Sequence, residues 1–180
     1  ASYIVTNNPQ IVNKISPIIA KIFTPMVTLM LFLFIIGIMV TGKNPTQDRE
    51  FLLILNALLV GVMALIIFSL QEMTKSGKQA IQLYTLLALS IITILINCVA
   101  LYSIIFRLVE FGFSANRVAV IGADIFIFTH LVLLTRKLFL LNQSKVSVTE
   151  VENTGGNYLP VYFIWVSLVV FLLPLIFNFK

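Results

Sequence analysis

Five long apolar stretches lie between residues 25 and 177 of this 180-residue chain, and they constrain its fold more than any other feature. Hydrophobic residues make up 59% of the chain and charged residues 11%, against roughly 45–50% and about 25% in a soluble domain. A water-soluble core of this size could not bury so much apolar surface, so the surrounding solvent must be hydrocarbon. The sequence therefore predicts an integral membrane protein of the all-α class.

The apolar stretches predict a polytopic transmembrane helical bundle that forms one domain over residues 1–180. The second stretch alone gives about 30 Å of helix, which matches the hydrocarbon thickness, and the longer third stretch must tilt or protrude. Ahead of the first span we expect a short interfacial helix, because Pro17 and Pro25 disfavour one continuous helix there. The five predicted spans are 22–40, 51–70, 81–106, 115–134 and 158–177.

The longest polar connection, residues 142–157, is predicted to be a surface loop. It holds Glu150 and Glu152 and the Asn-Thr-Gly-Gly sequence at 153–156, which is typical of a turn. The segment is therefore interpreted as a link between the fourth and fifth spans. At the start of the fifth span, Tyr158, Tyr162 and Trp165 predict an interfacial aromatic anchor.

The net charge of +5 is explained by cationic residues that flank membrane spans. No run of Lys and Arg forms a nucleic-acid patch, so we expect no nucleic-acid partner. With five spans, seven Lys and Arg residues fall on the N-terminal side of the membrane and five on the other. This bias predicts a cytoplasmic N-terminus.

The densest polar sequence joins the third and fourth spans. Gly112 is placed to end one helix in the left-handed conformation, and Ser114 to cap the next. Arg117 falls in the first turn of the fourth span, where the helix dipole disfavours a cation. We expect Glu110 to compensate it and Arg107 to join them in one charge cluster. Such a cluster either fixes the helical hairpin or binds a lipid phosphate or another acidic ligand.

The same residues carry a resemblance. The pattern Arg-x-x-Glu-aromatic-Gly-x-(Ser/Thr)-x-x-Arg, after an apolar helix that contains Tyr102, resembles a bacterial membrane family catalogued as a domain of unknown function (number 4153). The entry to the first span and the spacing of spans one to four are also similar, over roughly residues 15–140. The resemblance implies a multi-span protein of the bacterial inner membrane, and it implies no activity.

Two ionisable residues are predicted at hydrocarbon depth in the fourth span. Asp124 lies about 10 Å from Arg117 along the helix, and His130 lies about 9 Å from the far end. Ala119 and Ala123 share a small-residue face with His130, so we expect this histidine to point into the bundle.

Asp124 and His130 leave two interpretations open. They could line an intramembrane proton or ion pathway, or they could form hydrogen bonds inside the bundle with Asn56, Asn97 or Tyr102. One histidine and one aspartate cannot alone form a metal site. The sequence predicts no metal and no cofactor.

Three functional classes remain. The first is a non-catalytic scaffold or subunit of a membrane complex, because polar intramembrane residues are few. The second is a small transporter or ion-conducting protein that uses Asp124 and His130. The third is an enzyme acting on lipid-linked substrates, for which only Glu110 and its two neighbouring arginines approach a catalytic cluster. We favour the first class, with the lipid bilayer and membrane proteins as partners.

Overall fold

The structure is a computed structural model that describes the backbone of residues 9–41, 49–76 and 80–177, and within this part every regular element is an α-helix. The all-α prediction is therefore confirmed. In chain order the helices are α2 (Pro9–Thr41), α3 (Arg49–Ser76), α4 (Ala80–Phe111), α5 (Ala115–Asn142), α6 (Val148–Asn157), α7 (Leu159–Phe171) and α8 (Leu173–Ile176).

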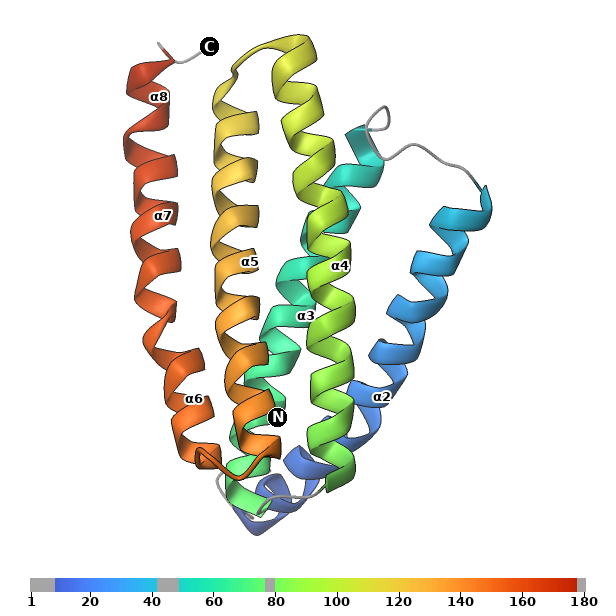
Figure 1. The fold of residues 1–180 in the computed structure, drawn as a ribbon. Helices are drawn as coiled ribbons and strands as arrows, with labels where there is room; N and C mark the ends of the chain where they lie inside the picture. Colours follow the sequence, from blue (N-terminus) through green and yellow to red (C-terminus); the bar gives the residue numbers. More distant parts are fainter. Residues whose placement is uncertain (1–8, 42–48, 77–79, 178–180) are drawn as a thin grey trace.

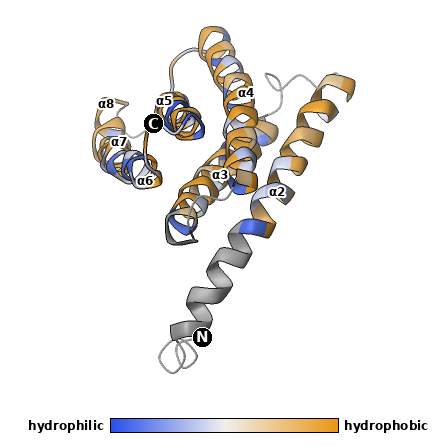
Figure 2. Cartoon of the chain, turned by 60° about the horizontal axis from the view of Figure 1, so that its bottom comes forward, coloured by the Kyte–Doolittle hydropathy of each residue, from blue (hydrophilic) through white to orange (hydrophobic). Residues whose placement is uncertain are grey.

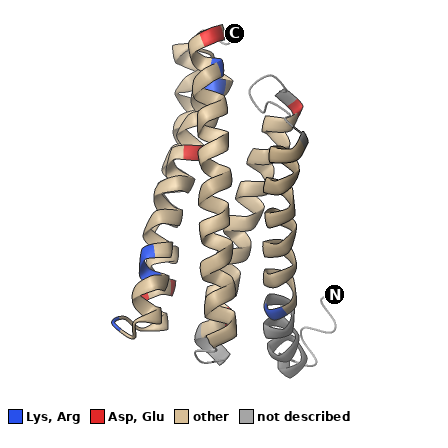
Figure 3. Ribbon diagram, turned by 45° about the vertical axis from the view of Figure 1, so that its right-hand side comes forward, with Lys and Arg blue, Asp and Glu red and all other residues tan. Residues whose placement is uncertain are grey.

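Five helical segments in the described part are long and apolar enough to cross a membrane, as predicted. The last of them combines α6, α7 and α8. Figure 3 shows Lys, Arg, Asp and Glu mainly at the two ends of the bundle, with mostly uncharged residues along its length. This distribution suits a hydrocarbon layer between two aqueous interfaces. The segments are Lys21–Val40, Glu50–Met73, Ala80–Phe111, Ala115–Asn142 and Val148–Ile176.

Helices α3, α4 and α5 form the centre of the bundle (Figure 1). Helix α2 packs on α3 and α4, whereas α6, α7 and α8 pack on α5 from the other side, with α6 also reaching α3. Figure 2 shows α2 and α7 on opposite flanks of the bundle. The successive spans run antiparallel, with α6, α7 and α8 together forming the last one, so the start of α3, the end of α4 and the start of α5 meet at one end (Figure 1).

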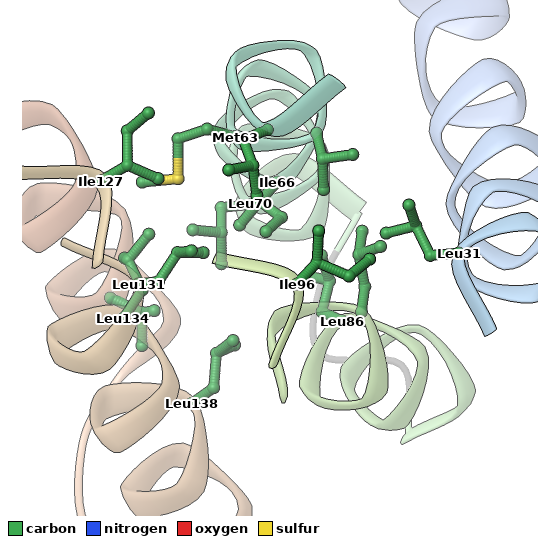
Figure 4. Packing of buried hydrophobic residues seen from close by; sticks show 14 of the residues in the cluster. Leu31, Met63, Ile66, Leu70, Leu86, Ile96, Ile127, Leu131, Leu134 and Leu138 are labelled. Carbon is green, nitrogen blue, oxygen red and sulfur yellow. The ribbon is translucent and has the colours of Figure 1, made fainter. Parts of the chain in front are cut away.

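The core lies where α3, α4 and α5 converge (Figure 4). On α5 the buried apolar positions from Ile127 to Leu141 recur every three or four residues, which places them on one stripe of the helix that joins this cluster. Leu31 is the contribution of α2 to this cluster. Side chains of this kind fill the interhelical space at interior density. The labelled core residues are Leu31, Met63, Ile66, Leu70, Leu86, Ile96, Ile127, Leu131, Leu134 and Leu138.

The predicted boundary between an interfacial helix and the first span is wrong. The structure continues α2 as one helix from Pro9 to Thr41, through both Pro17 and Pro25. A proline removes one backbone hydrogen bond and favours a kink, but the turns on either side can still propagate the helix. In a bilayer the remaining backbone groups have no water to bond to, so continuing the helix is favoured.

The predicted surface loop at 142–157 is also wrong over most of its length. The structure forms α6 there, because Ser147 and Glu150 make a reciprocal capping box at its start. Gly155, expected in a turn, is buried in the helix against Leu134 and Leu70. An added Cβ at this position would meet these side chains at ordinary van der Waals distance, so Gly155 is simply a helical residue of the α6 interface.

The fifth span is divided into α6, α7 and α8 at Tyr158 and Leu172. A proline follows each break within the first two positions of the next helix. Pro160 and Pro174 lack the N–H that would extend the preceding helix, and they suit the first turn of the following one. The segment therefore continues in one general direction with two local interruptions (Figure 1).

Candidate anion-binding cavity and buried polar residues

A cavity of about 290 Å³ lies where the start of α3, the end of α4 and the start of α5 meet. Its walls combine cationic and amide side chains with aliphatic ones, and none of the described residues that line it carries a carboxylate. The cavity therefore offers hydrogen-bond donors next to an apolar wall. The lining residues are Leu52, Leu53, Asn56, Ile104, Arg107, Ser114, Asn116, Arg117 and Val120.

The tight turn between α4 and α5 shapes one side of the cavity. Gly112 has φ of 74°, in the left-handed region that a residue with a side chain rarely adopts. Ser114 has extended backbone angles, and its hydroxyl oxygen accepts a hydrogen bond from the backbone N–H of Arg117 at 3.4 Å. Both predictions for this turn, the left-handed glycine and the serine cap, are confirmed.

The expected ion pair between Glu110 and the arginines is not formed. Glu110 is exposed and makes no salt bridge with Arg107 or Arg117 in the described part of the chain. Arg117 Nη1 instead donates to the carbonyl oxygens of Phe111 and Gly112, at 2.8 and 2.7 Å. The negative end of the α4 dipole thus compensates a cation that the start of α5 disfavours.

Of the two cations that line the cavity, Arg107 has the less complete set of hydrogen-bond partners. Its Nη1 is buried and has no hydrogen-bond partner among the residues that the structure describes. Its guanidinium carbon lies 6.0 Å from the ring centre of Phe111, and that of Arg117 lies 5.6 Å from the same ring. The ring therefore packs against both guanidinium groups and restricts where they can point.

Asp124, Asn97 and Asn56 lie deeper between the helices. Asp124 and Asn97 are 1% and 0% exposed, and Asp124 Oδ2 and both polar atoms of the Asn97 side chain lack a partner within the described ranges 9–41, 49–76 and 80–177. Asn56 is half-buried, lines the cavity and has an unpaired Oδ1 in the same part of the chain. Asp124 forms no hydrogen bond with either asparagine among the described residues, so that expectation is wrong.

His130 is fully buried, as predicted, but its partner comes from the fifth span. His130 Nδ1 lies 3.0 Å from the Tyr162 hydroxyl, and the imidazole stacks on Tyr158 with ring centres 4.3 Å apart. The sequence indicated an interfacial aromatic at Tyr162, whereas this residue is half-buried and packs against the core. Tyr102, an expected intrabundle partner, is 66% exposed and points outward.

Trp165, predicted to belong to an interfacial aromatic anchor, makes a contact with α5 that the sequence did not indicate. Its indole N–H donates to the carbonyl oxygen of Ala119 at 3.2 Å, and its ring lies directly over Gly122. Phe126 packs against the same indole with ring centres 5.3 Å apart. The small-residue face of α5 was the available signal, since such faces admit close approach of a neighbouring helix.

Neither a metal cluster nor a known relative assigns a function to these residues. Among the residues that the structure describes, no three His, Cys, Asp or Glu residues gather closely enough to hold a metal ion. No protein-family model, curated protein or solved structure matches this chain. The resemblance to the bacterial family of unknown function therefore stays a prediction.

Proposed function

We propose that the chain is a non-catalytic structural component of a complex in the bacterial inner membrane. The observation that supports this most is the bond between His130 and Tyr162, because the single histidine of the chain joins α5 to α7. Trp165 makes a second polar link between the same helices, and Thr24 and Ser69 make a buried one between α2 and α3 at 2.8 Å. Intramembrane polar groups used in this way act as interhelical contacts.

The outer faces of the flanking helices are the surfaces on which partner spans would pack. On α7 the outward residues include Phe163 and Phe171, which are 76% and 73% exposed, and on α2 they include Leu29, which is 59% exposed. In a bilayer such faces meet either lipid or another helix, and both contacts are apolar.

Site-specific photo-crosslinking in intact cells tests the proposal. A photoreactive residue at Phe163 or Leu29 should give a discrete, stoichiometric protein adduct, which mass spectrometry then identifies. The matched control is Leu131, which is fully buried in the core and should crosslink only within the chain. If both outer faces react with lipid alone, the chain is not a subunit of a complex.

A second candidate function is that of a small transporter or proton-conducting protein. Its support is that Asp124 Oδ2 and both polar atoms of the Asn97 side chain are buried and unpaired within the described part of the protein. Counted along antiparallel helices, Asn97 and His130 lie at a similar depth, about 22–24 Å from the turn between α4 and α5. Groups of this kind are expensive in hydrocarbon unless water or an ion meets them.

Proteoliposomes loaded with a pH-sensitive dye distinguish this candidate from the first. Conduction predicts proton flux that Asp124→Asn abolishes while folding is retained. Thr135→Ala is a suitable control on the same helix, because the Thr135 hydroxyl donates to the carbonyl of Leu131 one turn back. No flux in the unmodified protein would end the transport interpretation.

The proposed orientation places the N-terminus in the cytoplasm. It rests on the seven Lys and Arg residues of the N-terminal side against five on the other. In this orientation the cavity opens at the opposite end, beside the turn between α4 and α5 (Figure 1).

A further inference from the structure

The cavity at the end of the bundle has the electrostatic character of an anion site. Two guanidinium groups line it, and the first turn of α5 lies beside it. A helix N-terminus carries roughly half a positive charge and points backbone N–H groups outward. The negative end of α4 is met by Arg117, which bonds the carbonyls of Phe111 and Gly112, and the first turn of α3 carries Glu50. Within the cavity lining itself, the charged side chains are the cations Arg107 and Arg117.

The guanidinium of Arg107 is incompletely paired, because its buried Nη1 has no acceptor among the described residues. A side-chain rotation that brings this group to an anionic oxygen in the cavity would recover the free energy of the missing hydrogen bond. Arg117 directs Nη1 to two backbone carbonyls, which fixes its fork while Nε and Nη2 take no part in those bonds. The guanidinium groups of Arg107 and Arg117 both pack against the ring of Phe111. Two such planar groups can donate hydrogen bonds to different oxygens of one tetrahedral oxyanion.

The wall of the cavity changes character with depth. Ser114, Asn116 and Arg117 belong to the start of α5, and Val120 follows Arg117 about 4.5 Å deeper. Ile104 lies one helical turn before Arg107 on α4, again on the side toward the hydrocarbon. The charged end therefore sits at the membrane interface, and the deeper wall combines aliphatic side chains with the amide of Asn56.

We propose that this cavity binds a phosphate ester, with its anionic oxygens on Arg107 and Arg117 and the carbon chain of its substituent along Ile104 and Val120, where Asn56 can bond a substituent hydroxyl. At about 290 Å³ the cavity is at the lower limit of ligand pockets. A phosphate with a glycerol-sized substituent fits this scale, whereas acyl chains would remain in the bilayer. The same chemistry is offered by the headgroup of an anionic phospholipid and by a soluble phosphate monoester.

The test measures binding to the purified full-length chain in a phosphate-free maltoside detergent, with the emission of Trp165 reporting thermal unfolding. Dioleoyl phosphatidylglycerol in mixed micelles is one arm, and glycerol 3-phosphate and inorganic phosphate form the soluble arm. Arg107→Gln is the main variant. Its control is Arg136→Gln, which removes one exposed arginine at the opposite end of α5. Val120→Phe fills the cavity and leaves both arginines in place.

We expect a saturable rise in unfolding temperature, at least tenfold weaker binding in Arg107→Gln and Val120→Phe, and unchanged binding in Arg136→Gln. A rise with phosphatidylglycerol alone identifies a phospholipid as the source, and a rise with glycerol 3-phosphate identifies a soluble ester. If Arg107→Gln does not fold, Val120→Phe alone decides between binding in the cavity and elsewhere. Equal weakening in both arginine variants would show general surface attraction and overturn the proposal, as would no binding in either arm.

Discussion

The contact between Gly122 and Trp165 should make α5 intolerant of even one added methyl group. A Cβ built on Gly122 would overlap the ring atoms of the indole, which is held by its bond to the Ala119 carbonyl and by Phe126. In Gly122→Ala the indole must move away and break that bond. Overpacking costs about 1–3 kcal/mol and a membrane hydrogen bond about 0.6–1.7 kcal/mol.

A glycine-to-alanine change also favours a helix, by about 1 kcal/mol. The expected net destabilisation of Gly122→Ala is therefore about 1–3 kcal/mol. The matched control is Gly61→Ala on α3, where an added Cβ meets nothing within 4 Å, and this variant should be as stable as the unmodified chain or slightly more so.

The assay is unfolding in detergent followed by circular dichroism and by the emission of Trp165, the single tryptophan of the chain. Gly122→Ala should shift the emission of the folded protein, because the indole leaves its packed position. In a Trp165→Ala background, followed by circular dichroism alone, Gly122→Ala should lose most of its destabilising effect. If Gly122→Ala unfolds like Gly61→Ala with unchanged emission, the close contact between α5 and α7 is not present in the protein.

The remaining predictions concern helix ends and topology. Ser147→Ala should lower the unfolding free energy by about 1 kcal/mol and speed amide exchange across α6, because the capping box is lost; exchange as slow as in the unmodified chain would contradict this. Arg117→Gln should destabilise the hairpin between α4 and α5 more than Glu110→Gln. Arg117 bonds two carbonyls, whereas Glu110 is exposed without a salt bridge to the described residues. Thermal unfolding of the two variants side by side tests this, and an equal or lower unfolding temperature for Glu110→Gln would contradict it. In a Cys98→Ala background, an impermeant maleimide should label Thr46→Cys but not Ser76→Cys in sealed cells, and the reverse pattern would show an inverted topology.

Sequence patterns predicted the parts of the fold that hydrophobicity and local backbone chemistry decide. The five spans follow from the length of the apolar stretches, and the turn at Gly112 and Ser114 follows from local conformational preferences. The continuous α2 was missed because proline was interpreted as a boundary, although a bilayer favours helical continuation. Helix α6 was missed because Asn, Thr and Gly at 153–156 outweighed the capping box that begins at Ser147.

The candidate site was predictable only in part, because its pairings are tertiary. The two arginines and their position at one interface could be inferred from spacing within the hairpin. That Arg117 would choose the carbonyls of Phe111 and Gly112 over Glu110 depends on how closely α4 and α5 approach. Asn56 enters the cavity from α3, and no local pattern connects it to a turn that follows much later in the chain.

Helix α5 shows why periodicity alone could not assign the buried polar residues. Leu131 belongs to the core cluster shared with α3 and α4, Asp124 is buried, and Gly122 and His130 face α7. Because α5 is contacted on several sides, it has no single polar face. The spacing of its apolar residues therefore does not show which neighbouring helix a given polar residue contacts. The same helix supplies Arg117 to the cavity at its first turn. The residues that decide between structural support, conduction and anion binding thus share one element, and substitutions on its separate faces can test each function independently.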